Sequence, residues 1–188
     1  MATTSDISRG TFLRYNGELV IVLEYTHITP GKGNAVYQVK SRNVKTGKQT
    51  EIRFRSGEKV DIVRVENREM QYLYKEGDQA LICMDQETFE QMPVPAILFG
   101  DTLKFLQESM IVTIQFDDKN EPVNAEAPNY VELEVTYTEP GIKGDTATRT
   151  LKPATVETGA EVSVPLFVNI GEKIKINTQT GEYMERVK

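Results

Sequence analysis

The chain has 188 residues, 39% hydrophobic side chains, no tryptophan and a formal net charge of −6. Its length allows one large domain or several small ones. A single cysteine, Cys83, excludes an internal disulfide and indicates a reducing compartment. The first residues resemble no signal peptide, and no apolar run is long enough to span a membrane. We therefore expect a cytoplasmic protein that does not contact membranes.

Charge is distributed unevenly along the chain. Residues 1–64 hold 11 Lys and Arg against 6 Asp and Glu, residues 65–127 hold 4 against 13, and residues 128–188 hold 7 against 9. Ordinary charge scatter is the simplest explanation. The functional interpretation is that only the basic first segment faces nucleic-acid phosphate.

Residues 1–64 predict five short strands, and Asn16-Gly17 is a typical hairpin turn. We expect a small SH3-like (KOW) barrel. The outward positions of its strands and turns are basic: Lys40, Arg42, Lys45, Lys48, Arg53 and Arg55. Solubility alone would account for such a face, and so would binding along an RNA backbone.

The segment Pro30-Gly31-Lys32-Gly33 lies between two strand-like runs, 18–27 and 36–42. Proline fixes its own φ, and the two glycines permit positive φ, so a hairpin turn is predicted with Lys32 as its one long side chain. Most such tips are only soluble turns. A phosphate-binding loop is excluded because no helix follows the lysine.

Residues 65–127 predict an OB-type barrel. Strands are expected at 70–74, 80–84 and 111–116, with a turn and a one-turn helix at 85–90. Pro93 and Pro95 should interrupt regular structure. A short helix capped by Asp101 should present one apolar face, consisting of Leu103, Leu106 and Met110.

Residues 128–188 predict a third small barrel, also of OB type. Apolar residues alternate with polar ones from 131 to 137, and further strands are expected at 162–168, 173–177 and 182–187. A glycine-rich loop, 140–146, contains Gly144, Asp145 and Thr146. The whole chain is therefore predicted to be all-β, with three small barrel domains at 1–64, 65–127 and 128–188.

No catalytic constellation is present in the sequence. One histidine, His27, and one cysteine exclude a zinc cluster, and no serine lies in a nucleophile elbow. We expect a binding protein without enzymatic activity or cofactor.

Three motifs resemble those of bacterial elongation factor P: the tip 30–33, the loop 140–146 and the long segment 152–171. The resemblance covers the whole chain and includes the ending 181–188. It implies an L-shaped, tRNA-like monomer that binds both ribosomal subunits between the peptidyl and exit tRNA sites. Such a factor promotes peptide bond formation on ribosomes stalled at consecutive prolines by positioning peptidyl-tRNA.

The resemblance also assigns residues. It places Lys32 near the CCA end of peptidyl-tRNA and implies a lysine-modifying enzyme acting on it, with a chemistry that the sequence leaves open. It places Gly144, Asp145 and Thr146 near the exit-site codon of the mRNA, and Tyr183 and Arg186 against RNA near the small subunit. Two alternatives remain, an elongation-factor-P-like paralogue and a general OB-type RNA-binding protein using Tyr72 and Tyr74. The intact tip lysine argues against the first, and the acidic middle segment argues against the second.

Overall fold

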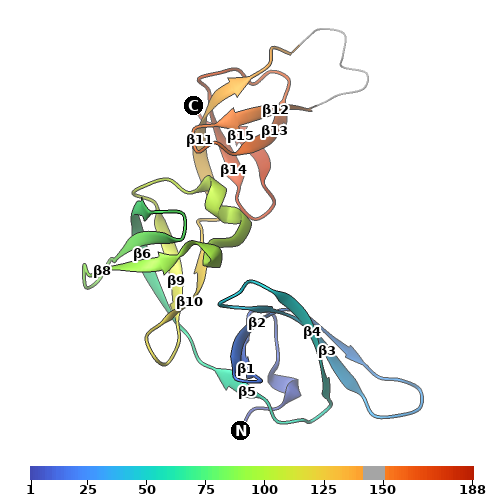
Figure 1. Cartoon of the computed structure of the whole chain (residues 1–188). Coiled ribbons are helices and arrows are strands. Elements are labelled where there is room, and N and C mark those ends of the chain that lie inside the picture. The colour runs from blue at the N-terminus through green and yellow to red at the C-terminus, as the bar shows by residue number, and fades with distance from the viewer. Residues whose placement is uncertain (142–150) are drawn as a thin grey trace. The chain divides into compact units, whose positions relative to one another are not determined.

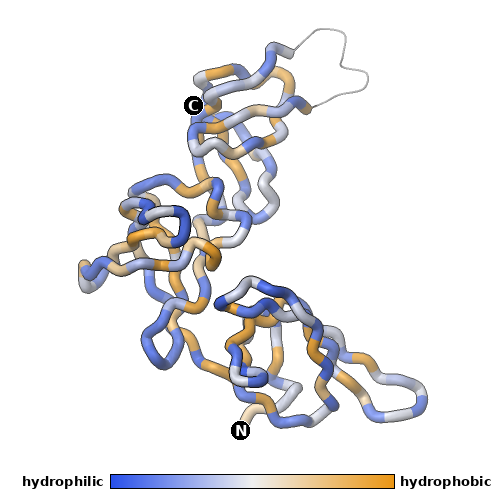
Figure 2. Tube along the Cα trace, in the orientation of Figure 1, coloured by the Kyte–Doolittle hydropathy of each residue, from blue (hydrophilic) through white to orange (hydrophobic). Residues whose placement is uncertain are grey.

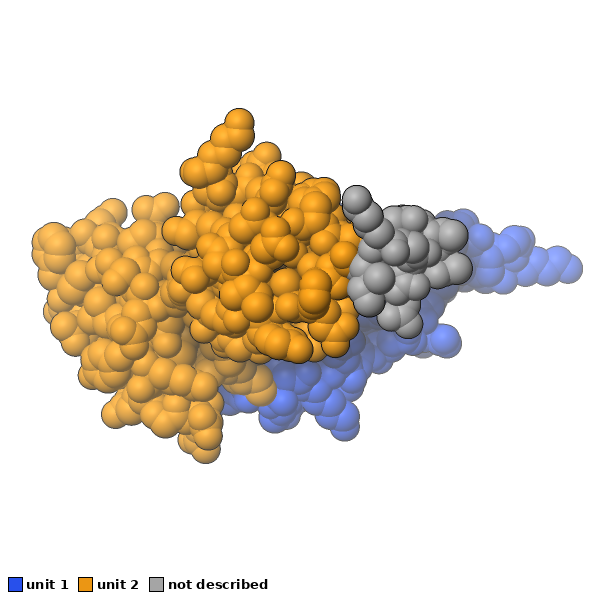
Figure 3. Space-filling view, turned by 90° about the horizontal axis from the view of Figure 1, so that it is seen from above, with its two compact units in different colours: residues 1–68, 114–124 blue, residues 69–113, 125–188 orange. Residues whose placement is uncertain are grey.

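A computed structural model describes residues 1–141 and 151–188 (Figure 1). The strands form three five-stranded sheets, two of which curl towards a barrel, so the prediction of an all-β protein is confirmed. The chain divides into two compact units, residues 1–68 with 114–124 and residues 69–113 with 125–188 (Figure 3).

The first sheet has the strand order β4-β3-β2-β1-β5, with all neighbours antiparallel. Asn16 and Gly17 adopt φ values of 50° and 80°, which closes the predicted hairpin between β1 and β2. One face buries a core that includes Leu13, Val22 and Val39. All five predicted strands are present: β1 (Phe12–Tyr15), β2 (Glu18–Ile28), β3 (Val36–Asn43), β4 (Gln49–Arg55) and β5 (Asp61–Val63), preceded by the 3₁₀ helix η1 (Thr4–Asp6).

The second sheet has the order β10-β9-β6-β7-β8. Its strands are β6 (Glu66–Glu76), β7 (Ala80–Asp85), β8 (Gln91–Pro95), β9 (Ile111–Phe116) and β10 (Pro122–Glu126). A kinked 3₁₀ segment, η2 (Ala96–Phe105), follows β8, with a non-helical Gly100 inside it.

Three local predictions in this segment were wrong. Residues 85–90 form a turn, because the Asp85 carboxylate accepts the backbone N–H groups of Glu87 and Thr88, and Phe89 has a φ of 60°. Pro93 and Pro95 lie inside β8, an edge strand that tolerates their missing donors. The expected helix starts earlier, at Ala96, and ends before Leu106, so Met110 lies outside it.

The third sheet has the order β13-β12-β11-β14-β15, again with antiparallel neighbours. Its core consists largely of valine and isoleucine, and it also buries Phe105 from η2. Pro165 ends β13, so the strand predicted at 162–168 is shorter. The strands are β11 (Tyr130–Thr138), β12 (Leu151–Val156), β13 (Glu161–Pro165), β14 (Lys173–Asn177) and β15 (Glu182–Arg186).

Candidate functional site: the lysine tip and its arm

The tip loop comprises residues 29–35, because the last antiparallel pair of β2 and β3 is Ile28 with Val36. Lys32 and its neighbours on both sides are exposed, and the loop is hydrophilic to neutral (Figure 2). Within the described residues, no carboxylate pairs with the Lys32 ammonium. The tip therefore presents a free cation, as the sequence predicted.

The two glycines of the tip differ in conformation. Gly33 has a φ of 120°, which disfavours any side chain, as expected. Gly31 does not have a positive φ, and a Cβ atom there would meet nothing within 4 Å. The expectation of positive φ is therefore met at Gly33 only. The fold itself does not explain the glycine at 31.

The strands behind the tip form a segment that we call the arm: residues 24–28 of β2, 36–40 of β3 and 51–55 of β4. A β-bulge between Val22 and Glu24 shifts the register where β2 enters the arm. Residues 24–28 are all exposed, whereas Val22 is buried. The bulge thus marks the point where β2 leaves the packed core.

The predicted cations of the arm share its outer face. The register places Arg53 beside Gln38 and Lys40 beside Glu51, and Arg55 follows on the same face of β4. Lys40 Nζ is 3.1 Å from Glu24 Oε2. Arg53 and Arg55 are exposed, and their guanidinium groups have no carboxylate partner among the described residues. Three cations of the predicted basic face, Lys40, Arg53 and Arg55, therefore lie together on the arm, and the two guanidinium groups are free of carboxylates.

Arg42 differs from the other predicted cations. It is half-buried, and its Nη2 lies 3.5 Å from the Asn124 Oδ1 atom. That contact engages part of the guanidinium within the first unit.

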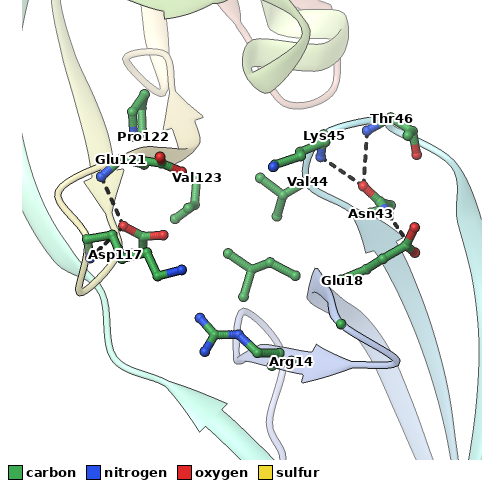
Figure 4. A pocket seen from close by; sticks show the side chains of 13 residues that line it. Arg14, Glu18, Asn43, Val44, Lys45, Thr46, Asp117, Glu121, Pro122 and Val123 are labelled. Carbon is green, nitrogen blue, oxygen red and sulfur yellow. Dashed lines mark hydrogen bonds between the residues drawn. The ribbon is translucent and has the colours of Figure 1, made fainter.

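A pocket of about 400 Å³ in the first unit is a second feature (Figure 4). Two polar side chains that line the pocket already accept hydrogen bonds from the backbone of local turns. Asn43 Oδ1 accepts the backbone N–H groups of Lys45 and Thr46, and Asp117 Oδ1 accepts those of Lys119 and Glu121. Both cationic and carboxylate side chains line the pocket, so its lining favours neither an anionic nor a cationic ligand.

The predicted RNA contacts in β15 are placed differently from one another. Tyr183 is half-buried and packs against the third core. Arg186 is exposed, with Nη1 3.2 Å from Glu172 Oε1 and its guanidinium 4.7 Å from the Phe167 ring centroid. The backbone N–H of Asn169, and then Arg186, lower the pKa of Glu172. Arg186 is therefore accessible but already paired.

The glycine-rich loop is described only at its start. Gly144, Asp145 and Thr146 lie outside the described residues. At Gly141 a Cβ atom would be 2.6 Å from the Leu166 carbonyl oxygen, so this glycine is required by the chain's own packing. Close by, the buried Lys152 donates to the Glu139 carbonyl oxygen at 2.5 Å.

The aromatic pair that a general RNA-binding OB protein would use is split. Tyr72 is 7% exposed, and burial raises its pKa, whereas Tyr74 is 49% exposed. A register shift in β6 lies between them. They therefore do not form the shared stacking face which that alternative needs.

The described residues contain one cysteine and no cluster of metal ligands. Cys83 is fully buried, and burial raises its pKa to about 11. No group of three or more His, Cys, Asp and Glu side chains there could hold a metal ion. None of the helices in residues 1–141 and 151–188 has the length and apolarity to cross a membrane.

Sequence reasoning missed one feature of the arm. Tyr25, His27 and Tyr37 form a set of stacked rings on its inner face. His27 was expected to serve only a surface or packing role. The sequence shows several aromatic residues between positions 25 and 37, but it does not show the strand register that brings them together.

Comparison with known proteins agrees with the fold. Residues 3–60 match the model of the "Elongation factor P (EF-P) KOW-like domain", residues 65–125 the "Elongation factor P (EF-P) OB domain", and residues 131–186 "Elongation factor P, C-terminal". The solved structure of "Eukaryotic translation initiation factor 5A from Methanococcus jannaschii" is similar in fold. It has a TM-score of 0.53 and 18% identity, with 68% of this chain and 90% of that chain covered.

Full-length relatives are also similar. Elongation factor P of Clostridium kluyveri is 49% identical over 187 residues, and that of Chloroherpeton thalassium is 50% identical over 188, with all of both chains covered in each case. Elongation factor P of Chloroflexus aggregans is 47% identical, covering 98% of each chain. These matches span all three sheets, and the chain belongs to the elongation factor P family of bacterial translation elongation factors.

Proposed function

We propose that the protein binds the ribosome between the peptidyl and exit tRNA sites and promotes peptide bond formation where consecutive prolines stall translation. The observation that carries the proposal is the exposed, unpaired Lys32 at the end of the arm. No packing role competes for this side chain. Its free ammonium is suited to contact tRNA phosphate or sugar.

The proposed mechanism is positioning of peptidyl-tRNA. Proline fixes its own φ, which restricts how a nascent chain can present its reacting ends. Holding the peptidyl-tRNA in a productive orientation lowers the entropic part of the barrier without acid or base chemistry. The five residues of β2 in the arm, at roughly 3.3 Å each, carry the tip loop about 16 Å beyond the bulge, which suits entry into an RNA crevice. The factor is thus non-enzymatic and stimulates the ribosome's own reaction.

We also propose which other residues of the chain contact RNA. Lys40, Arg53 and Arg55 on the basic outer face would bind peptidyl-tRNA or ribosomal RNA. Arg186, with Tyr183 beside it, would contact RNA near the small subunit. Gly144, Asp145 and Thr146 would meet the exit-site codon. The functional domains would be residues 1–64, 65–127 and 128–188, acting as one monomer.

Modification of Lys32 is part of the proposal. The tip is exposed, and a Cβ atom at Gly31 would meet nothing within 4 Å, so the loop leaves room for an enzyme active site. An extension of the amine would add reach and hydrogen-bond donors towards tRNA.

The test is translation in an extract depleted of this protein. Two reporters differ only in a run of consecutive prolines. The purified protein should restore the proline reporter and leave the control reporter unchanged. Equal stimulation of both reporters, or of neither, would refute the proposed function.

A further inference from the structure

The inner face of the arm carries three stacked rings. The Tyr25 and Tyr37 ring centroids are 6.5 Å apart with an interplanar angle of 21°, and those of His27 and Tyr37 are 4.5 Å apart at 17°. Tyr37 is half-buried and packs against the first core. Tyr25 is 44% exposed, and His27 is also exposed. Tyr37 is therefore the middle ring, held against the core, and the two outer rings of the stack are exposed.

The register explains why these rings share a face. His27 pairs with Tyr37, and Tyr25 pairs with Val39, which is fully buried. The stack thus continues the core face of the first sheet past the bulge. Within the described residues, no other ring and no cation lies over Tyr25 or His27. The two rings that end the stack thus carry no further ring or cation, and both side chains are exposed.

Charge separates the two faces of the arm. Both carboxylates of the arm, Glu24 and Glu51, lie on the outer face, where Lys40 and the Gln38 amide contact them at 3.1 Å and 2.9 Å. The inner face of the arm carries no carboxylate in any of its three strand segments. A polyanion can therefore approach the rings without meeting a negative side chain, and Lys32 at the tip adds a positive one.

We infer that Tyr25 and His27 form a stacking site for an unpaired base of RNA. The inference rests on the proposed function, since the ribosomal complex supplies the RNA. Every nucleobase has a flat π-face, so an aromatic stack ending in solvent accepts one without sequence preference. The absence of acids on this face favours RNA over a basic protein segment. The base would be held beside the arm while Lys32 reaches further along the same RNA.

The experiment uses the full-length protein and ribosomes that carry peptidyl-tRNA. The double variant Tyr25→Leu, His27→Leu keeps apolar side chains but removes both rings. The matched control Tyr25→Phe, His27→Tyr keeps both. A second control, Tyr130→Leu, removes a tyrosine of similar exposure, 48%, from the third sheet. Binding affinity, melting temperature and protection of RNA bases from dimethyl sulfate are measured for each.

We expect the leucine double variant to bind about 5- to 100-fold more weakly, the range for loss of one stacked base, and to lose protection of one unpaired base. Both controls should behave as the unaltered protein, and all melting temperatures should agree within a few degrees. Unchanged affinity and footprint in the leucine variant would overturn the inference. A large drop in its melting temperature would also do so, because the rings would then be structural.

The same measurements distinguish failure of the stacking site from failure of the proposed function. If the leucine variant binds normally while Lys32→Ala abolishes rescue of the proline reporter, the stacking site is wrong and the proposed function stands. If the unaltered protein fails to bind ribosomes, both are refuted.

Discussion

The guanidinium of Arg186 lies 4.7 Å from the centroid of the Phe167 ring, which is itself 55% exposed. The ring of one loop thus holds the cation of β15 against the surface, where Glu172 also contacts it. Both contacts favour one conformation of the arginine side chain in the absence of a partner. An ordered arginine loses less side-chain entropy on binding than a free one.

Replacing Arg186 by alanine should therefore weaken ribosome binding more than folding. Exposed cation–π and ion-pair contacts each contribute about 1 kcal/mol or less to stability. Binding is measured by sedimentation with ribosomes, and stability by thermal denaturation. Glu172→Gln is the control, since it removes the carboxylate charge and keeps the arginine. If Arg186→Ala binds as tightly as the unaltered protein, this arginine does not contact RNA.

The basic outer face of the arm gives the second prediction. The guanidinium groups of Arg53 and Arg55 pair with no carboxylate among the described residues, so reversing both residues to glutamate should weaken ribosome binding and flatten its salt dependence. Each lost phosphate contact lowers the slope of log K against log salt by about 0.7 to 0.9. Reversal of Lys75 and Lys104, in the acidic segment, is the control and should change little. An unaltered slope in the arginine variant would exclude this face from the interface.

Sequence patterns predicted much of the fold, and the misses have physical causes. The first sheet was predictable because Asn16-Gly17 fixes the first hairpin and Val39 and Ile52 alternate with polar neighbours. The aromatic stack was not, because the bulge after Val22 changes which residues of β2 face inwards. Before it Val20 and Val22 face the core, whereas after it Tyr25 and His27 share the face of Tyr37.

Packing between residues far apart in the chain was also not predictable from the sequence. Phe105 is the last residue of η2, which follows a strand of the second sheet, but its side chain is buried in the core of the third sheet. The apolar helix face predicted from the sequence consisted of Leu103, Leu106 and Met110 and did not include Phe105. The exposed tip is the opposite case, because proline, glycine and lysine define their local structure within four residues.

Gly141 gives the third prediction. Its missing Cβ would lie 2.6 Å from the Leu166 carbonyl oxygen, so Gly141→Ala should destabilise the third sheet by about 1–3 kcal/mol. Chemical denaturation measures the loss. Gly31→Ala is the matched control, because the Cβ there meets nothing within 4 Å. Equal stability of both variants would show that the loop shifts at no cost.

Cys83 gives the fourth prediction. Its pKa is raised from 9.0 to about 11 by burial, so the thiol stays protonated in the folded protein at pH 8. It should react with a thiol reagent only after unfolding. The unfolded chain loses this proton at lower pH than the folded one, so stability should fall as pH rises from about 9 to 11. Cys83→Ala should remove that part of the pH dependence, and rapid labelling of the native protein would contradict the burial.

The last prediction concerns Lys32. Lys32→Ala should fold normally, because substitutions at exposed turn positions usually change stability by less than about 0.5 kcal/mol. It should nevertheless lose rescue of the proline reporter, since the tip has no other long side chain. Lys48→Ala, which removes an exposed lysine from the connection between β3 and β4, away from the tip, is the control and should rescue fully.

Lys32→Arg separates charge from chemistry. Arginine keeps the positive charge but changes reach, shape and the amine that an enzyme could extend, so this variant should lose much of its activity in the native host. The intact mass of protein from that host reports any extension directly. A mass equal to that of the plain sequence would exclude the modification and leave the tip mechanism in place. Full rescue by Lys32→Ala would refute the tip mechanism itself, because no other side chain of the loop can carry a cation into the ribosome.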